Sequence, residues 1–325
     1  MKRRSFISKN IALGAIIPAS YGALGFSRIE DGKHTDFEDI QNEVVIEKVR
    51  EGKPFNGKVL AVIQPHCDDI PIYAAGTVAK LIYEGYTGYL IRTSNDEAAG
   101  TGATNGERFF NNEKDNADVT RVLGLKKTYD LNYRNHRMDE YNIQEIKGRF
   151  IFLFRLLKVD ALICYDPYGQ YEENPDHYIT ARAVEAARWM AGMSSDYPEQ
   201  LEVVEPHTVT EMYYFARGPQ IVNRIVDISE FIDTKVECNI VCKTQGPGGD
   251  KGSDLRKRLA ADGKILPILG EDDHTANVNY IKEFVLDNDK KLGEKYGLSW
   301  AEAFHYIGPA PSKIDDYIQK NTIPK

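Results

Sequence analysis

The chain has 325 residues, and 42% of them are apolar, so it is long enough to bury a sizeable core as one large domain or two small ones. Its net charge of −8 argues against nucleic acid or an anionic membrane surface as a partner. No apolar stretch approaches the roughly 20 residues that a membrane helix needs, which argues against a stable membrane anchor.

The first residues have the pattern of an export signal. Lys2-Arg3-Arg4 precedes the short apolar segment Ile11–Ile17, and paired arginines followed by Ser5 are typical of a twin-arginine signal. We therefore expect a signal over residues 1–25, a polar arm over 26–55, and a mature protein that is periplasmic or secreted.

Strand and helix patterns then alternate along the chain. Strands are predicted at 58–63, 89–93, 127–131, 161–165 and 209–216, and helices at 72–84, 106–123, 143–157 and 176–190. Such repeated units predict an α/β fold, a Rossmann-like, mostly parallel sheet with helices on both faces. The pattern after residue 227 is mostly helical, at 227–242 and 277–296, with a glycine-rich loop at 246–252. One domain is expected over 56–312, followed by a tail at 313–325.

Two polar clusters follow two buried strands. His66-Cys67-Asp68-Asp69 comes after the apolar run Val59–Ile63, and Asn174-Pro175-Asp176-His177 comes after Ala161–Cys164. Imidazole and carboxylate groups at the edge of a core need partners, and a divalent metal would satisfy them. Because ligands bind at the carboxyl ends of strands in such sheets, the two clusters predict one metal site there.

Blander interpretations exist for several of these residues. Asp68 and Asp69 could cap the following helix, although two carboxylates and an imidazole exceed what a cap needs. Asp176 is expected to cap the helix that runs to about Met190. The isolated histidines are interpreted as surface or satisfied side chains; they are His34, His136, His207, His274 and His305.

The two clusters together resemble the PIG-L/LmbE family of zinc-dependent N-deacetylases. That family carries His-Pro-Asp-Asp-Glu after its first strand and His-Pro-Asp-His at the start of a later helix. The resemblance continues through Lys235–Gln245 and Ala301-Glu302-Ala303-Phe304, and so spans nearly the whole mature chain.

This resemblance implies His66, Asp69 and His177 as zinc ligands and Asp68 as the general base that acts on zinc-bound water. It also implies that the chain removes an N-acetyl group from an N-acetylglucosamine-type sugar or glycoconjugate. Two histidines and one carboxylate leave a metal with an open position, which a catalytic site requires. The same donors suit ferrous iron as well as zinc.

The chain departs from the family pattern at several positions. Asn174 stands where relatives have a histidine, and its amide can donate a hydrogen bond but cannot deliver a proton. Cys67 and Ile70 replace a proline and a glutamate, and Cys242 stands where a histidine is frequent. An alternative function is therefore an exported, metal-containing glycan-binding protein with an inactive deacetylase site.

Substrate contacts are predicted less directly than the metal ligands. Arg108 lies in the region where the family contacts sugar, and Asp96, in the stretch that matches the family after the second predicted strand, is the other predicted substrate contact. Three tyrosines near the second cluster, Tyr165, Tyr168 and Tyr171, could stack on a sugar ring.

Overall fold

The computed structural model describes residues 44–309 and 313–323. The predicted export signal at 1–25 and the first part of the predicted arm lie outside the described residues. Within the described ranges, no helix combines the length and apolar character that crossing a membrane requires.

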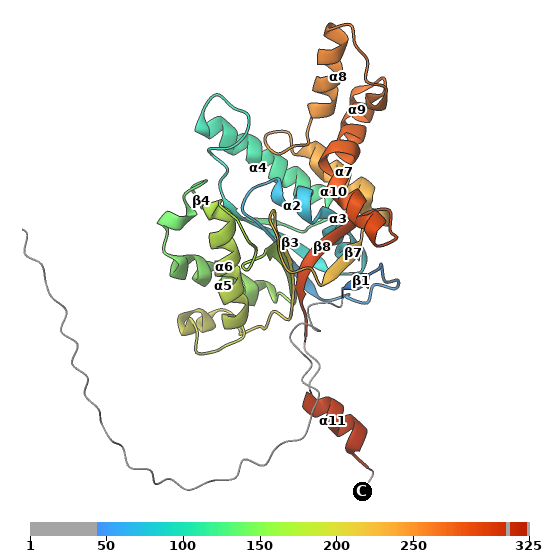
Figure 1. The fold of residues 1–325 in the computed structure, drawn as a ribbon. Helices are drawn as coiled ribbons and strands as arrows, with labels where there is room; N and C mark the ends of the chain where they lie inside the picture. Colours follow the sequence, from blue (N-terminus) through green and yellow to red (C-terminus); the bar gives the residue numbers. More distant parts are fainter. Residues whose placement is uncertain (1–43, 310–312, 324–325) are drawn as a thin grey trace, which may run out of the picture. The chain divides into compact units, whose positions relative to one another are not determined.

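The described strands form a single sheet of eight (Figure 1). They are β1 (Val45–Glu47), β2 (Val59–Gln64), β3 (Thr87–Ser94), β4 (Thr128–Tyr133), β5 (Ala161–Tyr165), β6 (Glu211–Phe215), β7 (Arg224–Asp227) and β8 (Ala301–Ile307). Their order is β1-β7-β8-β6-β5-β2-β3-β4. Every neighbouring pair is parallel except those of β8, which is antiparallel to β6 and β7. The predicted mostly parallel sheet is confirmed.

Helices cover both faces of the sheet, as predicted (Figure 1). The helices within the described residues are α2 (Asp69–Tyr73), α3 (Ala75–Tyr83), α4 (Asn105–Val122), α5 (Ile143–Leu157), α6 (Pro175–Met190), α7 (Ile232–Val241), α8 (Lys251–Ala261), α9 (Asp273–Tyr280), α10 (Asp287–Lys295) and α11 (Lys313–Asn321). Helices α5 and α6 pack together, while α2, α3 and α4 pack against α7. A π-helical turn at Ile281–Val285 joins α9 to α10.

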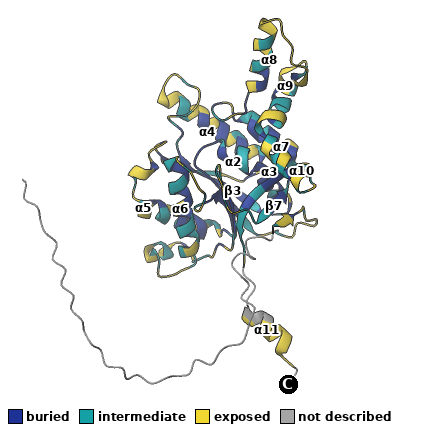
Figure 2. Cartoon of the chain, in the orientation of Figure 1, coloured by how far each residue is buried: buried dark blue, intermediate teal, exposed yellow. Residues whose placement is uncertain are grey.

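The central strands are buried from both sides (Figure 2). Residues 60–63 of β2 and 161–164 of β5 are fully inaccessible to solvent. A strand that is covered by helices on both faces has no solvent-facing side, so it reads as an uninterrupted apolar run. This is why the two strands that precede the polar clusters were recognisable in the sequence.

The strand order places a crevice at the carboxyl ends of β2 and β5. The chain runs from β2 to β3 and β4 in one direction, then returns to β5 and continues to β6 on the other side. Adjacent parallel strands whose connections leave in opposite directions open a crevice between them, and ligands bind there. The two predicted clusters follow these two strands.

The N-terminal and central regions differ locally from expectation. Residues 45–47, within the predicted arm, form β1 and pair with β7. The single helix predicted at 72–84 is two helices, α2 and α3, which meet at Ala74 in a non-helical conformation.

Further differences lie after residue 220. The predicted helix at 227–242 is preceded by strand β7 and begins only at Ile232. The predicted glycine-rich loop runs directly into α8, and the tail contains α11. No element was predicted where β8 lies. This strand places Glu302 next to α3, and the backbone N–H groups of Gly76 and Thr77 donate to the Glu302 carboxylate.

Candidate metal centre

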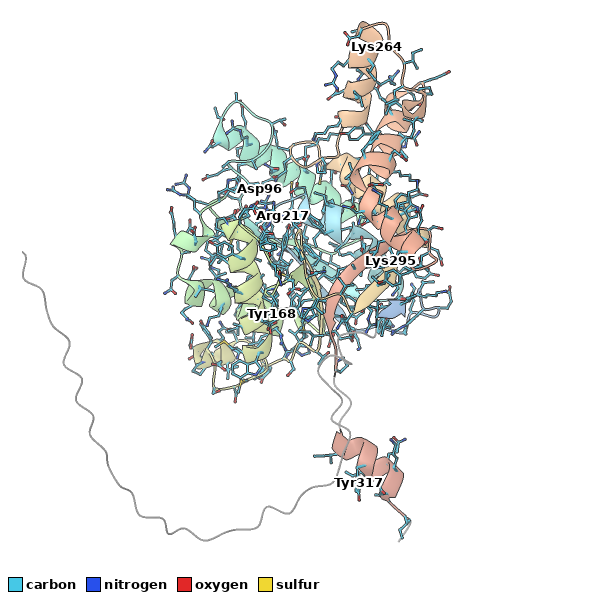
Figure 3. The ribbon with its side chains drawn as sticks, viewed as in Figure 1. Asp96, Tyr168, Arg217, Lys264, Lys295 and Tyr317 are labelled. Carbon is cyan, nitrogen blue, oxygen red and sulfur yellow. The ribbon has the colours of Figure 1, made fainter. Side chains whose placement is uncertain are left out.

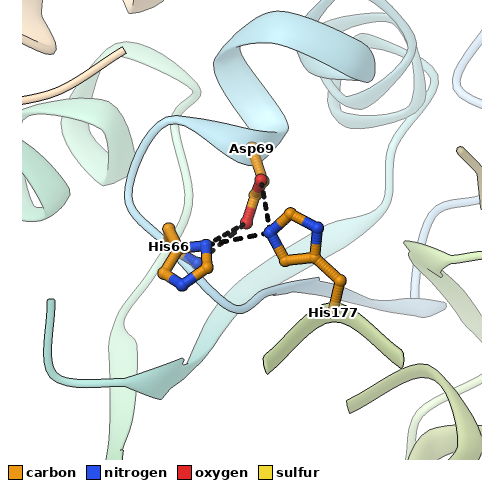
Figure 4. A group of neighbouring side chains, drawn as sticks. All are labelled: His66, Asp69 and His177. Carbon is orange, nitrogen blue, oxygen red and sulfur yellow. Dashed lines mark hydrogen bonds and ion pairs between the residues drawn. The ribbon is translucent and has the colours of Figure 1, made fainter. Parts of the chain in front are cut away.

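Three buried side chains converge at the carboxyl ends of β2 and β5 (Figure 4). His66 lies two residues after β2, Asp69 begins α2, and His177 lies in the first turn of α6. The Nδ1 atom of His66 is 3.0 Å from Nε2 of His177. Oδ2 of Asp69 is 3.5 Å from His66 Nδ1, and Oδ1 of Asp69 is 3.6 Å from His177 Nε2.

These separations fit a tetrahedral metal ion. Bonds of about 2.0–2.2 Å in a tetrahedron imply ligand–ligand edges of about 3.3–3.6 Å. The two imidazole nitrogens are 3.0 Å apart, each lies 3.5–3.6 Å from a different oxygen of the Asp69 carboxylate, and with one ligand atom per residue all three atoms lie within 4.8 Å of one another. The residues present therefore fit a divalent cation with two histidines and one carboxylate as ligands.

The outer nitrogen of each histidine also faces a carboxylate. His66 Nε2 is 2.9 Å from Oδ2 of Asp176, and His177 Nδ1 is 3.1 Å from Oε2 of Glu172. Carboxylates in this position fix the ring orientation of metal-binding histidines and raise their basicity. Both rings are thereby oriented with their remaining nitrogens toward Asp69.

Asp176 has a different role from the predicted helix cap. Asn174 is the N-cap of α6, and its Oδ1 accepts a hydrogen bond from the backbone N–H of Asp176. The Asp176 side chain instead turns inward, is fully buried, and accepts hydrogen bonds from the backbone N–H groups of His136 and Met138. The prediction was wrong because either residue of an Asn-Pro-Asp sequence is a good cap.

Tyr165, at the end of β5, contacts two of the three candidate metal ligands. Its ring stacks on His177 with a centroid separation of 4.1 Å, and its hydroxyl donates to Oδ1 of Asp69 over 2.7 Å. The side chain is buried, so it positions the candidate ligands and does not present a free face to a sugar.

The two adjacent aspartates have opposite electrostatic environments. Burial raises the pKa of Asp68, and the negative charge of Asp69 raises it further, to about 7. Burial also acts to raise the pKa of Asp69, but the charges and hydrogen bonds of His177 and His66 outweigh it and hold this pKa at about 2. Asp69 is therefore ionised for metal binding, whereas Asp68 can exchange a proton near neutral pH. The Asp68 side chain makes no capping hydrogen bond to α2.

A cavity of about 370 Å³ opens over the metal centre. It is lined by His66, Asp68, Asp69, Ile72, Tyr73, His136, Asn174, His177, Arg217, Gln245 and Pro247. Asp68 and Asn174 thus share one cavity with all three candidate ligands. Because Oδ1 of Asn174 accepts the helix-cap hydrogen bond, its donating NH₂ group is the end available to the cavity.

Sequence reasoning missed His136 and Arg217. His136 was interpreted as a surface or satisfied histidine; it is exposed, and it also lines the cavity with its ring centroid 6.0 Å from that of His66. Its backbone is left-handed, with φ of 61°, which turns the chain back toward the site. Arg217 follows β6 and forms an ion pair with Glu172. Neither residue carried a local sequence signal for the site.

The two predicted substrate contacts do not line this cavity. Asp96 is fully buried, forms an ion pair with Arg92 over 3.3 Å, and accepts a hydrogen bond from the backbone N–H of Cys67 (Figure 3). Arg108 is half-buried on α4, where it donates to Asn105. Cys67 is also buried and donates to Asn112, as expected of a structural thiol.

Comparison with known proteins agrees with this geometry. Residues 61–188 match the family described as PIG-L, GlcNAc-PI de-N-acetylase. The chain is 26% identical over 203 residues to a diacetylchitobiose deacetylase of Thermococcus kodakarensis, which covers 60% of this chain and 73% of the relative.

Solved structures share the fold. The N,N'-diacetylchitobiose deacetylase of Pyrococcus horikoshii superimposes with a TM-score of 0.62 at 22% identity, over 77% of this chain and 84% of that one. GalB of Pseudomonas putida, a 4-carboxy-2-hydroxymuconate hydratase, superimposes with a TM-score of 0.57 at 13% identity, over 79% of this chain and 98% of that one. The fold thus carries more than one kind of chemistry, and the family rests on the sequence match. The matched residues include His66, Asp69 and His177, so the resemblance to the PIG-L/LmbE family is confirmed over residues 61–188.

Proposed function

We propose that this protein is a metal-dependent amidohydrolase that removes the N-acetyl group from an N-acetylglucosamine-type sugar or glycoconjugate. The observation that carries the proposal is the buried His66–Asp69–His177 group with Asp68 in the same cavity. The diacetylchitobiose deacetylase relative supports an N-acetylated amino sugar as the substrate class.

The ligand set suits zinc, and ferrous iron is the second candidate because it accepts the same donors. A divalent metal held by these residues acts as a Lewis acid on the acetamide carbonyl and lowers the pKa of water. Tyr165, Asp176 and Glu172 hold the three ligands in the geometry that this chemistry needs.

Asp68 has the properties of a general base. Its pKa is about 7 without a metal, and a bound cation favours the carboxylate, which accepts the proton of the attacking water at neutral pH and then returns it to the sugar nitrogen as the amide bond breaks. One residue performing both transfers compensates for the absence of a proton-donating histidine at position 174. The NH₂ group of Asn174 donates a hydrogen bond to the oxygen of the tetrahedral intermediate.

The proposed compartment is the periplasm or the cell exterior. The paired arginines Arg3 and Arg4 before a short apolar segment support export through a twin-arginine signal. Replacing both arginines with lysine should leave the protein in the cytoplasmic fraction. Export of that variant at the normal level would contradict this route.

The central test measures acetate release and metal content in the same preparations. Asp68→Asn should retain about one metal per chain and lose at least 100-fold in acetate release from N-acetylated sugars, because general base catalysis contributes 10²–10⁴-fold. His177→Ala should lose both metal and activity. Unchanged turnover in Asp68→Asn would contradict its role as the base.

The alternative is a glycan-binding protein with an inactive site. That function predicts sugar affinity in the native protein and in Asp68→Asn, with no acetate released by either. The metal-reconstituted native protein distinguishes the two functions directly.

A further inference from the structure

The outward face of α6 carries an aromatic and charged stripe. Tyr178, Arg182, Glu185 and Trp189 recur at spacings of four, three and four residues, which places them on one side of the helix. The opposite side is buried against the sheet. Trp189 is 61% exposed, although tryptophan has a large apolar side chain that is costly to leave in contact with water.

Two exposed tyrosines of the loop before α6 extend this stripe. Tyr168 is 57% exposed and Tyr171 is 82% exposed. The Tyr168 hydroxyl donates to Oε1 of Glu185 over 3.1 Å, so the ring is held beside the helix. Tyr171 has a left-handed backbone with φ of 60°, an uncommon conformation for a bulky residue and one that is frequent at functional sites.

Two adjoining hollows lie along these residues. One, of about 420 Å³, is lined by Tyr171, Glu172, Tyr178 and Arg182, among others. The second, of about 480 Å³, is lined by Tyr168, Arg182, Glu185 and Trp189, among others. The hollows share Pro167 and Arg182, so they form one continuous surface. We refer to this surface as the α6 groove.

The α6 groove is connected to the metal centre through Glu172. This residue lines the groove, lies 3.1 Å from His177 Nδ1 and forms an ion pair of 2.7 Å with Arg217, which lines the catalytic cavity. The loops are also joined by their backbones, because the N–H of Gln170 donates to the carbonyl of Pro219. Figure 3 labels Arg217, which lines the catalytic cavity, and Tyr168, which lines the α6 groove.

The chemistry of the groove matches carbohydrate. A pyranose ring has an apolar face of C–H groups that stacks on aromatic rings, and an edge of hydroxyl groups that bonds to charged side chains. The groove supplies both, with Tyr168, Tyr171 and Trp189 as ring platforms and with Arg182 and Glu185 between them. Trp189 follows His177 by twelve residues on the same helix, about 18 Å along its axis, which exceeds the reach of one sugar.

We infer that the α6 groove binds the sugar units that flank the unit being deacetylated, so that the preferred substrate is an oligosaccharide or glycan chain and not a monosaccharide. This inference rests on the proposed deacetylation, because the chain must enter the catalytic cavity next to Glu172. The groove then sets substrate length, whereas the metal centre sets the reaction.

The test compares N-acetylglucosamine with its β-1,4-linked tetramer as substrates of the metal-reconstituted enzyme. Trp189→Ala should raise KM for the tetramer roughly tenfold, the effect of losing one aromatic contact, and leave kcat unchanged. The same variant should leave kcat/KM for the monosaccharide unchanged. Tyr171→Ala should have the same pattern. Phe284→Ala is the matched control, because Phe284 is an exposed aromatic residue at 53% and lies outside the groove.

Binding without turnover separates this inference from the proposed function. Tetramer binding to Asp68→Asn, followed by tryptophan fluorescence, should perturb the exposed Trp189 and weaken in Trp189→Ala. If acetate is released with equal efficiency from both substrates in every variant, the groove has no role and only the deacetylation stands. If the tetramer binds through Trp189 but no acetate appears, the groove stands and the deacetylation does not.

Discussion

Gly246 packs directly against the carboxylate of Asp68. A Cβ atom placed on Gly246 would lie 2.8 Å from Oδ2 and 2.9 Å from Cβ of Asp68, which is closer than real Cβ contacts allow. Gly246 also has φ of 80°, a conformation that favours glycine. The loop after α7 therefore closes over the candidate base, and Gln245 and Pro247 on either side of Gly246 line the cavity.

This contact predicts that Gly246→Ala displaces the base and spares the metal. We expect kcat to fall by at least tenfold, because small displacements of a catalytic group are costly, while metal content stays at the native level. Gly52→Ala is the matched control, since Gly52 also has φ of 80° but has no neighbour within 4 Å of an added Cβ. Equal losses of activity in the two variants would assign the effect to backbone strain and contradict displacement of Asp68.

Asp176→Asn is expected to weaken metal binding while the ligands themselves remain. Asp176 accepts hydrogen bonds from His66 and from the backbone of His136, so the substitution removes the charge that supports the His66 ring. Loss of such an outer carboxylate lowers metal affinity about 10–100-fold. Competition with a chelator measures this affinity. Asp227→Asn, at a carboxylate that bonds to Ser229, should leave it unchanged.

The sequence predicted strands β2 to β6 of the sheet and the residues that converge, and the clearest of these predictions have one physical reason. Strands β2 and β5 are buried on both faces, so their apolar runs and the polar clusters that follow them were unambiguous. The peripheral strands lack that signal. Strand β7 has four residues, and β8 reads Ala-Glu-Ala-Phe, which suits a helix as well as a strand until pairing with β6 and β7 decides it.

The surroundings of the candidate metal centre could not be predicted for a different reason. His136 and Glu172 reach the site through loop geometry, and positive φ values at His136 and Tyr171 are not encoded by glycine or asparagine. Arg217 reaches the cavity only because β6 lies beside β5 in the sheet. The metal-binding residues can be predicted from a sequence motif, whereas the residues around them can be identified only once the complete fold is known.

The pKa of Asp68 predicts a titration near neutral pH in the metal-free protein. Burial and Asp69 raise this pKa from 3.8 to about 7, so the folded state favours the protonated form. The contribution of Asp68 to the free energy of unfolding is therefore lost as pH rises from about 4 to about 7. Asp69, whose pKa is lowered to about 2, behaves in the opposite way: its contribution is lost as pH falls. Carbon-13 NMR of the aspartate carboxyl groups measures both.

Asp68→Asn should remove the step near pH 7 and leave the acidic step of Asp69 in place. Adding zinc to the native protein should shift the Asp68 step to lower pH, because a nearby cation favours the carboxylate. If the native spectrum has no carboxyl step above pH 5 without metal, the electrostatic argument for Asp68 fails.

Glu302→Gln is predicted to destabilise the fold through the buried Lys235. The Lys235 ammonium is fully buried and lies 2.6 Å from Glu302 and 2.6 Å from Asp289. Leaving a buried charge without any partner costs about 3–5 kcal/mol, and because Asp289 still pairs with Lys235 in this variant we expect a smaller loss of more than about 1 kcal/mol. Chemical denaturation measures this change. Glu283→Gln, which breaks a 3.8 Å pair with Lys290 at the surface, should cost less than about 1 kcal/mol.

Asn174→Asp separates the two functions that we assign to this side chain. Aspartate keeps the oxygen that accepts the hydrogen bond from the Asp176 backbone, and it caps helices as well as asparagine does. It has no NH₂ group to donate into the cavity. We therefore expect unfolding free energy within about 0.5 kcal/mol of native, and kcat lower by about 10²–10³, the effect of losing one oxyanion donor. Asn174→Ala should lose both the cap, at about 1 kcal/mol, and the activity. Native turnover by Asn174→Asp, with metal content unchanged, would leave Asn174 as a helix cap alone and move the donor role to His136 or Arg217, which line the same cavity.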